Sequence, residues 1–329
     1  MIHLAVHIPH RYESESEMTA IAQGVSRSPW DSLRKWYQKR EQAFSGYTYL
    51  LPTILSVLIF IVFPVVFSFY ISFYRFNYLS PKMTFLGFQN YTRMLTSERF
   101  WTVLWNTCRY VIGAVPLGMA FSLALAMLIN RKLVGINFFR SAYFSPVITS
   151  SIAVAMIWRW IFDPTFGLLN LLLEKVGIPG ITWLGDTNLA MWCLVVMSVW
   201  NGAGYNMIIF LAGLQSISQE YYDAATVDGA NSLQTFRYVT WPLLSPTTFF
   251  VFITGIIGSL QVFDIVWLST DATGGPAGST RTIVFYLWEQ GFKYYDMGFA
   301  SALAYILFFI IFVLTLINWR ITGRMVHYQ

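Results

Sequence analysis

The sequence predicts an all-α membrane protein whose chain crosses the bilayer six times. Of its 329 residues, 56% are hydrophobic and only 11% are charged, whereas an average soluble domain has about 25% charged residues. Six stretches have the length of about 20 apolar residues that a membrane-spanning helix needs. They cover residues 48–74, 102–129, 138–162, 189–214, 244–268 and 297–319.

Residues 1–45 are predicted to form a separate tail before the membrane domain of residues 46–329. The tail has no apolar segment of the length that a signal peptide requires, so the first apolar run is expected to be a retained span. Ser28 and Pro29 predict a helix start, with Ser28 as the capping residue. Aromatic residues then share one face of a basic helix, which indicates an amphipathic helix lying on membrane lipid. A disordered tail is the alternative.

Six spans place both termini on one side of the membrane. More Lys and Arg residues flank the spans on the side of the termini than on the other side. Basic residues accumulate in cytoplasmic loops, so both termini and the loop over residues 215–243 are predicted to be cytoplasmic. Half of the basic residues on the side of the termini come from the N-terminal tail.

Several function classes are not expected from the composition. Cys108 and Cys193 fall inside predicted spans without metal-ligand spacing, and the four histidines lie near the termini, so we expect neither a metal site nor a membrane-embedded enzyme. The Gly274–Thr280 segment lacks the Lys of a phosphate-binding loop, and no such motif occurs elsewhere, so the chain is not expected to hydrolyse ATP. The basic residues sit beside apolar runs, which argues against nucleic acid as a partner.

The loop between the fourth and fifth spans has the pattern of two short helices. Ser218 is predicted to cap the first helix, whose first turns hold Glu220 and Asp223, where the helix dipole favours acids. Ala224 and Ala225 are expected to leave one side of this helix bare, so that another surface can approach closely.

Gly229 then permits a turn that a residue with a Cβ atom resists. A second short helix is predicted to carry Phe236 and Arg237 and to end near Trp241, where Pro242 is expected to open the fifth membrane helix. The two helices would project from the membrane as an L-shaped pair with a small acidic tip. Such an ordered loop predicts a docking site for another protein.

This loop resembles a family signature. Asp223-Ala224-Ala225, then Gly229, and nine residues later Val239-x-Trp241-Pro242 are similar to the E-A-A-x-x-x-G-x9-I-x-L-P pattern of binding-protein-dependent ABC importer permeases. Three positions depart from it: Asp223 replaces Glu, Val239 replaces Ile and Trp241 replaces Leu. The first two are conservative, whereas Trp241 leaves the corner between loop and membrane open to question.

Other segments resemble the carbohydrate branch of that family, which includes the maltose-type permeases. They are Leu211–Ile217, Phe85–Tyr91, Gln261–Asp264 and Thr273–Pro276. The likeness covers the chain from about residue 45 to its end, and the loop motif is its specific part.

The resemblance implies a permease subunit in the bacterial cytoplasmic membrane. It implies as partners a second related permease, two ATPase subunits that bind ATP and Mg, and an extracytoplasmic solute-binding protein, with no cofactor in this chain. The loop would be the coupling helix that inserts into an ATPase cleft, with Glu220 and Asp223 pairing with basic ATPase residues. Ala224, Ala225 and Gly229 would allow close contact. The implied solute is a sugar, oligosaccharide, sugar alcohol or glycerol-phosphate-like molecule.

Polar residues inside spans are functional candidates, because burying them in lipid is costly. Asn201, Tyr205 and Asn206 in the fourth span suit a carbohydrate, whose hydroxyls bind amides and whose ring stacks on aromatic side chains. Gln261 and Asp264 in the fifth span are further candidates for the substrate path. Bonding between neighbouring helices is the alternative for all of them.

Arg109 and Asp264 are predicted to form one structural ion pair within the membrane. Asp264 is also the strongest carboxylate candidate for the rival function, an ion-coupled secondary transporter of small polar solutes. That rival also needs paired interrupted helices, and the sequence shows no obvious pair.

Overall fold

The computed structural model describes residues 47–130 and 135–322. The predicted amphipathic helix of the N-terminal tail lies outside the described residues. The chain divides into two compact units, Met1–Val66 and Phe67–Gln329.

The first predicted span is a helix over Tyr47–Ser72. A π-helical turn, η1 (Leu58–Val62), interrupts it, and every described side chain of the first unit is exposed. A helix that is apolar on all sides needs lipid or another protein around it. Its last part, α3 (Phe63–Ser72), has Ile71 and Ser72 buried in the second unit.

A short β-hairpin follows the first span, which the all-α prediction did not include. β1 (Tyr74–Asn77) pairs antiparallel with β2 (Ser80–Phe85), and α4 (Gln89–Leu95) comes next. The buried Asn90 side chain donates to the carbonyls of Ser72 and Tyr74, at 2.8 and 3.0 Å. These bonds tie the end of the first span to α4.

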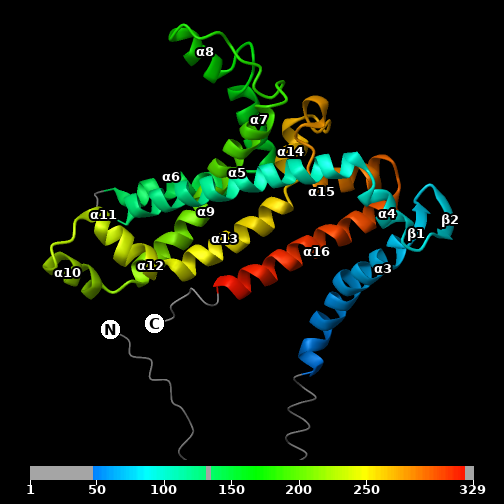
Figure 1. Cartoon of the computed structure of the whole chain (residues 1–329), viewed down its shortest axis with the longest axis horizontal. Helices are drawn as coiled ribbons and strands as arrows, with labels where there is room; N and C mark the ends of the chain where they lie inside the picture. Colours follow the sequence, from blue (N-terminus) through cyan, green and yellow to red (C-terminus); the bar gives the residue numbers. More distant parts are fainter. Residues whose placement is uncertain (1–46, 131–134, 323–329) are drawn as a thin grey trace, which may run out of the picture. The chain divides into compact units, whose positions relative to one another are not determined.

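The second and fourth spans, α5 (Glu98–Ile129) and α9 (Ala190–Ser216), form the centre of the second unit. Figure 1 shows them side by side with α13. A Cβ added at Gly113 would lie 2.9 Å from the Trp192 ring, so the two long helices pack at close range there. Small residues of this kind let membrane helices approach one another.

The third span is broken rather than continuous. α6 (Ile136–Ile148) and α7 (Ser151–Ile161) meet at a bend of 100°. Pro146 lies in the last turn of α6, and Thr149 has extended backbone. Proline and hydroxyl side chains both compete with helix hydrogen bonding, which accounts for the break. α8 (Leu168–Lys175) lies beyond α7.

The fifth span is broken as well. α13 (Ser245–Leu260) ends before Gln261, and α14 (Asp264–Ser269) resumes after a non-helical step at Phe263. The loop that precedes it contains α10 (Gln219–Val227), α11 (Ser232–Thr235), the π-helical η2 (Phe236–Thr240) and α12 (Trp241–Leu243).

The last span is α16 (Met297–Thr322). Before it come η3 (Pro276–Gly278), α15 (Ile283–Trp288) and the π-helical η4 (Glu289–Lys293). Within the described ranges, four helices are long and apolar enough to cross a membrane. Two bent helix pairs each supply one more candidate, Phe138–Ile148 with Ser151–Ile161 and Ser232–Leu243 with Ser245–Leu260. The six-span prediction is confirmed on this count.

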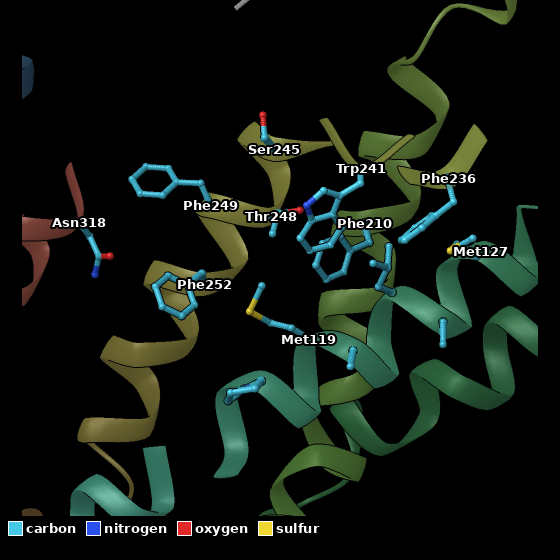
Figure 2. Close-up of a pocket in the computed structure, with 14 residues that line it drawn as sticks. Met119, Met127, Phe210, Phe236, Trp241, Ser245, Thr248, Phe249, Phe252 and Asn318 are labelled. Carbon is cyan, nitrogen blue, oxygen red and sulfur yellow. The ribbon is translucent and has the colours of Figure 1, made fainter. Parts of the chain in front are cut away.

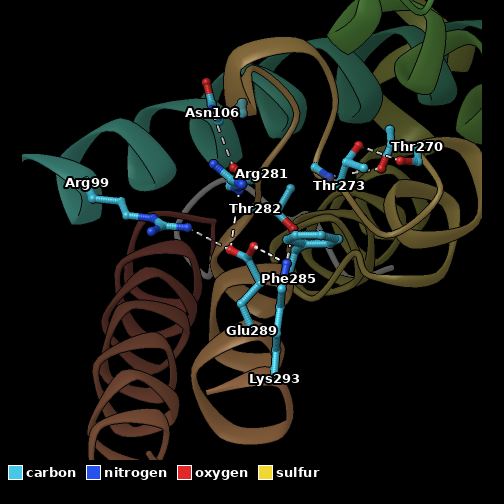
Figure 3. Close-up of polar contacts among 11 residues, drawn as sticks. Arg99, Asn106, Thr270, Thr273, Arg281, Thr282, Phe285, Glu289 and Lys293 are labelled. Atoms are coloured by element: carbon cyan, nitrogen blue, oxygen red, sulfur yellow. Dashed lines mark hydrogen bonds and ion pairs between the residues drawn. The ribbon is translucent and has the colours of Figure 1, made fainter.

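A polar cluster holds these last elements against α5, as Figure 3 shows. The Glu289 carboxylate is fully buried and lies 3.1 Å from Arg99, 3.3 Å from Arg281 and 4.0 Å from Lys293. We call these four residues the Glu289 cluster. A buried carboxylate is tolerated only when it is paired in this way.

The same region explains Asn106, a buried polar residue inside the second span. Its amide donates to the carbonyls of Gly278 and Arg281, at 3.1 and 3.2 Å. The Thr107 hydroxyl accepts from the backbone N–H of Ile283. Both side chains therefore hold the 278–283 segment on α5.

Candidate functional site

The helix α10 begins as the sequence predicted. The Ser218 hydroxyl accepts a hydrogen bond from the backbone N–H of Glu220 at 3.4 Å, which satisfies one free donor of the first turn. Glu220 and Asp223 are both exposed, and the Gln219 amide donates to Asp223 at 3.1 Å. Two carboxylates are therefore available on the surface of this helix.

The two alanines do not share one bare side. Ala224 is exposed, whereas Ala225 is buried against the protein. Gly229 has φ +74° and no atom near its missing Cβ, so the left-handed turn and not crowding requires glycine there. The most exposed aliphatic side chains on this loop are Val227 at 87% and Leu233 at 75%. Sequence reasoning did not select them, and such exposed apolar groups are typical of a protein contact.

The second short helix starts with a reciprocal cap that sequence reasoning missed. The Asn231 side chain accepts from the backbone of Gln234 at 3.0 Å, and the Gln234 side chain accepts from the backbone of Asn231 at 2.8 Å. This capping box fixes the direction in which the chain returns to the membrane. The signal was present as an Asn followed three residues later by a Gln.

The helical path then continues further than predicted. Pro242 lies within α12, and it is Pro246 that stands at the start of the membrane helix α13. The break falls at Leu244, with a bend of 68° between the loop segment and the membrane helix. The corner between loop and membrane therefore lies just after the Trp241-Pro242 pair.

Trp241 lies in the wall of an apolar cavity at this corner. The cavity has a volume of about 790 Å³ and is lined by residues of α5, α9, η2, α12, α13 and α16. Figure 2 shows the Trp241 ring among other aromatic side chains, and the Phe236 ring centroid is 6.1 Å from it. The Trp241 side chain, which replaces the Leu of the family pattern, is thus accommodated in the wall of this apolar cavity.

The loop is joined to both flanking membrane helices. The Thr240 hydroxyl donates to the Tyr222 hydroxyl at 3.4 Å, linking η2 to α10. A Cβ added at Gly213 would lie 2.4 Å from the Thr247 hydroxyl, so α9 and α13 are in tight contact directly above the loop. The loop is therefore continuous with two membrane helices that contact each other directly.

These two helices and α5 enclose a second cavity of about 250 Å³, which we call the membrane cavity. Tyr205 and Asn206 line it, as candidates for the substrate path. Its other polar lining residues are Tyr110, Ser198, Thr254 and Ser259, with Gly118, Gly202, Gly255 and Gly258 between them. The hydroxyls of Tyr110 and Ser198 are hydrogen-bonded to each other.

The other three candidates for the path lie elsewhere. Asn201 directly precedes the lining residue Gly202 but does not itself line the membrane cavity. Its side-chain oxygen is buried with no hydrogen-bond donor among the described residues. Gln261 and Asp264 are exposed at the break between α13 and α14. The hydroxyl residues were missed because sequence reasoning selected amides and charges, while Ser and Thr are common in spans.

The structure does not bring Arg109 and Asp264 together. Among the residues that it describes, neither side chain takes part in an ion pair. The prediction compared depths along two continuous helices, but the fifth span is interrupted at Gln261–Phe263. Asp264 stands instead in the first turn of α14, where the helix dipole favours an acid.

A loop with exposed acids, joined to helices that surround a polar cavity, is the arrangement expected of a membrane component of a transport system. Residues 114–320 match the family described as "Binding-protein-dependent transport system inner membrane component", and the chain belongs to this family. It is thus a multi-pass ABC importer permease of the inner membrane, and the resemblance seen in the loop motif is confirmed.

Named relatives cover nearly the whole chain. It is 36% identical to "Probable ABC transporter permease protein YesP" of Bacillus subtilis, over 91% of this chain and 97% of the relative. It is 34% identical to "Arabinooligosaccharides transport system permease protein AraP" of the same organism, over 92% and 95%. It is 32% identical to "Trehalose/maltose transport system permease protein MalF" of Thermococcus litoralis, over 87% and 96%.

A solved structure shares the fold. A chain of a bacterial ABC transporter involved in the import of the acidic polysaccharide alginate superposes with a TM-score of 0.78, at 22% identity, covering 89% of this chain and all of that chain. At this identity the likeness establishes the fold alone.

Proposed function

We propose that this chain forms, with a second permease, the path of an importer for a neutral sugar or oligosaccharide, driven by two separate ATPase subunits. The observation that carries the proposal is the connection from the exposed tip of α10 to α9 and α13, the helices that enclose the membrane cavity. ATP-driven closure of the ATPases would tilt these helices between two states of access. The termini and the 215–243 loop face the cytoplasm in this arrangement.

The lining of the membrane cavity supports a neutral solute. Its described side chains are hydroxyls, one amide, glycines and apolar groups, with no charged residue among them. Hydroxyls and amides both donate and accept hydrogen bonds, as sugar hydroxyls require. Relatives named for arabinooligosaccharides, trehalose/maltose and lactose favour the same class. An ion-coupled transporter is not favoured, because the family depends on a binding protein.

The loop provides the test of ATPase coupling. Gly229→Asp adds a charged side chain and forces it into a left-handed turn at the proposed contact. We expect the ATPase subunits to be lost when the tagged permease complex is purified, and sugar uptake to fall at least tenfold. The matched control is Gly177→Asp, since Gly177 has φ +80° and equally open surroundings but follows α8.

The control variant is expected to keep both the ATPase and uptake. Equal loss in the two variants would show that backbone strain, rather than the loop contact, is responsible. Sugar uptake by the permeases in the absence of any ATPase would overturn the proposed function.

A further inference from the structure

A third cavity, of about 440 Å³, lies at the end of α9 opposite to the loop. Three segments meet around it: the C-terminal end of α7, the residues just before α9, and the residues just after α14. Its volume is within the range of about 300–1,000 Å³ that is usual for small-molecule sites. Nothing in the coupling of the loop or in the membrane cavity accounts for it.

One wall of this cavity is an aromatic side chain in a fixed orientation. The Trp183 indole N–H donates to the side chain of Asn170 at 2.8 Å. Asn170 is 1% exposed. Its amide group also donates to the carbonyls of Pro164 and Ile181, and its side-chain oxygen accepts from the backbone N–H of Ile181. Because its N–H is already used, Trp183 presents only ring surface to a ligand. Phe162, which also lines the cavity, packs beside it with ring centroids 6.1 Å apart.

Another part of the cavity lining is a bidentate charge pair. The Arg159 guanidinium donates to both carboxylate oxygens of Asp271, at 2.6 and 2.8 Å. Both side chains remain partly exposed, at 43% and 69%, so donors and acceptors stay open to a ligand. Asp271 and Ala272 have φ of 49° and 56°, and such strained non-glycine residues gather at functional sites.

A second carboxylate determines which ligand charge is compatible with this cavity. Asp163 lines it and accepts hydrogen bonds from the backbone N–H groups of Phe166 and Thr165, which lower the pKa of its carboxyl group. The site therefore has two carboxylates and one guanidinium, counting its described charged residues. A net negative site disfavours phosphorylated solutes and sugar acids, and it leaves neutral polyols as the fitting class.

We propose that this cavity binds one ring of a neutral saccharide before the saccharide enters the membrane cavity. The ring's apolar face stacks on Trp183, and neighbouring hydroxyls bond the Arg159–Asp271 pair, donating to the carboxylate and accepting from the guanidinium. This inference rests on the proposed function, which supplies the saccharide and places the cavity on the outer side of the membrane.

The test observes Trp183 itself. The complete transporter, with both permeases and both ATPases, is labelled with 5-fluorotryptophan and placed in lipid nanodiscs without binding protein. Its fluorine resonance for Trp183 is the one that disappears in Trp183→Phe. Maltotriose and arabinotriose are the neutral probes, and trigalacturonate is the anionic one. We expect a saturable shift of this resonance with at least one neutral probe and none with the anionic probe.

Two variants distinguish an effect of the Arg159–Asp271 pair on binding from an effect on folding. Asp271→Asn keeps a residue that tolerates positive φ, yet it is expected to raise the midpoint of the titration at least tenfold. The control is Phe166→Leu, which alters an exposed aromatic side chain in the segment after α7 that does not line the cavity. It is expected to leave the midpoint unchanged.

The outcomes that overturn the inference differ from those that overturn the proposed function. A complex that transports saccharide in vesicles but shows no shift of the Trp183 resonance with any probe excludes this site alone. A shift caused only by an unliganded binding protein also excludes it, and identifies a protein contact instead. A wild-type complex that transports no saccharide overturns the proposed function.

Discussion

The 215–243 loop and the N-terminal end of α5 are stabilised in different ways. In the loop, the hydrogen bonds join close neighbours in the sequence, as with Asn231 and Gln234. At the N-terminal end of α5, they join distant segments, as with Arg99 and Glu289, which are 190 positions apart. The loop has exposed acids and apolar side chains, whereas the Glu289 carboxylate at the end of α5 is completely buried.

This difference matches two mechanical tasks. A loop that is ordered by local caps keeps its shape while it moves as a unit against another protein. An end that is cross-linked by long-range polar contacts resists movement of its elements relative to one another. We infer that the 215–243 loop is the part that moves, whereas the N-terminal end of α5 stays fixed against the segments that pack on it.

The largest expected effect comes from disrupting the Glu289 cluster at the N-terminal end of α5. Glu289→Gln removes the carboxylate from the Glu289 cluster and leaves Arg99, Arg281 and Lys293 without their common partner. Loss of one partner of a buried ion pair costs about 3–5 kcal/mol, and we expect the lower end because the cations are partly exposed. Thermal unfolding of the purified complex measures the change.

The matched control is Glu174→Gln, which alters an exposed acid in α8. It is expected to change stability by less than about 0.5 kcal/mol. If the two variants unfold at the same temperature, the Glu289 cluster does not stabilise the N-terminal end of α5.

A smaller effect is expected at the loop. Asn231→Ala removes the capping box, which is worth about 1 kcal/mol to the short helix. We expect the membrane helices to unfold at the wild-type temperature, while limited proteolysis cuts the 215–243 loop several times faster. Combining Asn231→Ala with Gln234→Ala should add little, since either change breaks the reciprocal bonds. A lower unfolding temperature of the whole complex would contradict the local character of the loop.

The smallest expected effect is one of pH at Asp163. Backbone N–H groups lower the pKa of this carboxyl group below its ordinary value of 3.8. A lowered pKa in the folded state means that the stabilisation is present above 3.8 and is lost as the pH falls through the folded-state value. The difference in unfolding temperature between wild type and Asp163→Ala should therefore be constant from pH 7 to pH 5. A difference that shrinks within that range would show that these hydrogen bonds do not hold the carboxylate.

The spans and the loop helices were predictable because their signals are local. Apolar runs of sufficient length indicate spans without knowledge of their neighbours. Ser218, together with the residues that follow it, indicates the start of α10. The breaks at Thr149 and Gln261 were not predicted, because an apolar stretch can contain a short non-helical step without losing its hydropathy. The ion pair of Arg109 and Asp264 failed for the same reason, since it assumed an unbroken fifth helix.

The sequence by itself determined the number of spans, the position and caps of the loop, and the family, because each depends on residues close together in the chain. Only the tertiary structure decided which polar side chains meet. Asn106 bonds the 278–281 segment, Glu289 lies within 4.0 Å of three cationic side chains, and Trp183 and Asp271 line the same cavity. These contacts depend on how bent helices pack in three dimensions, and spacing along the chain carries no record of that packing.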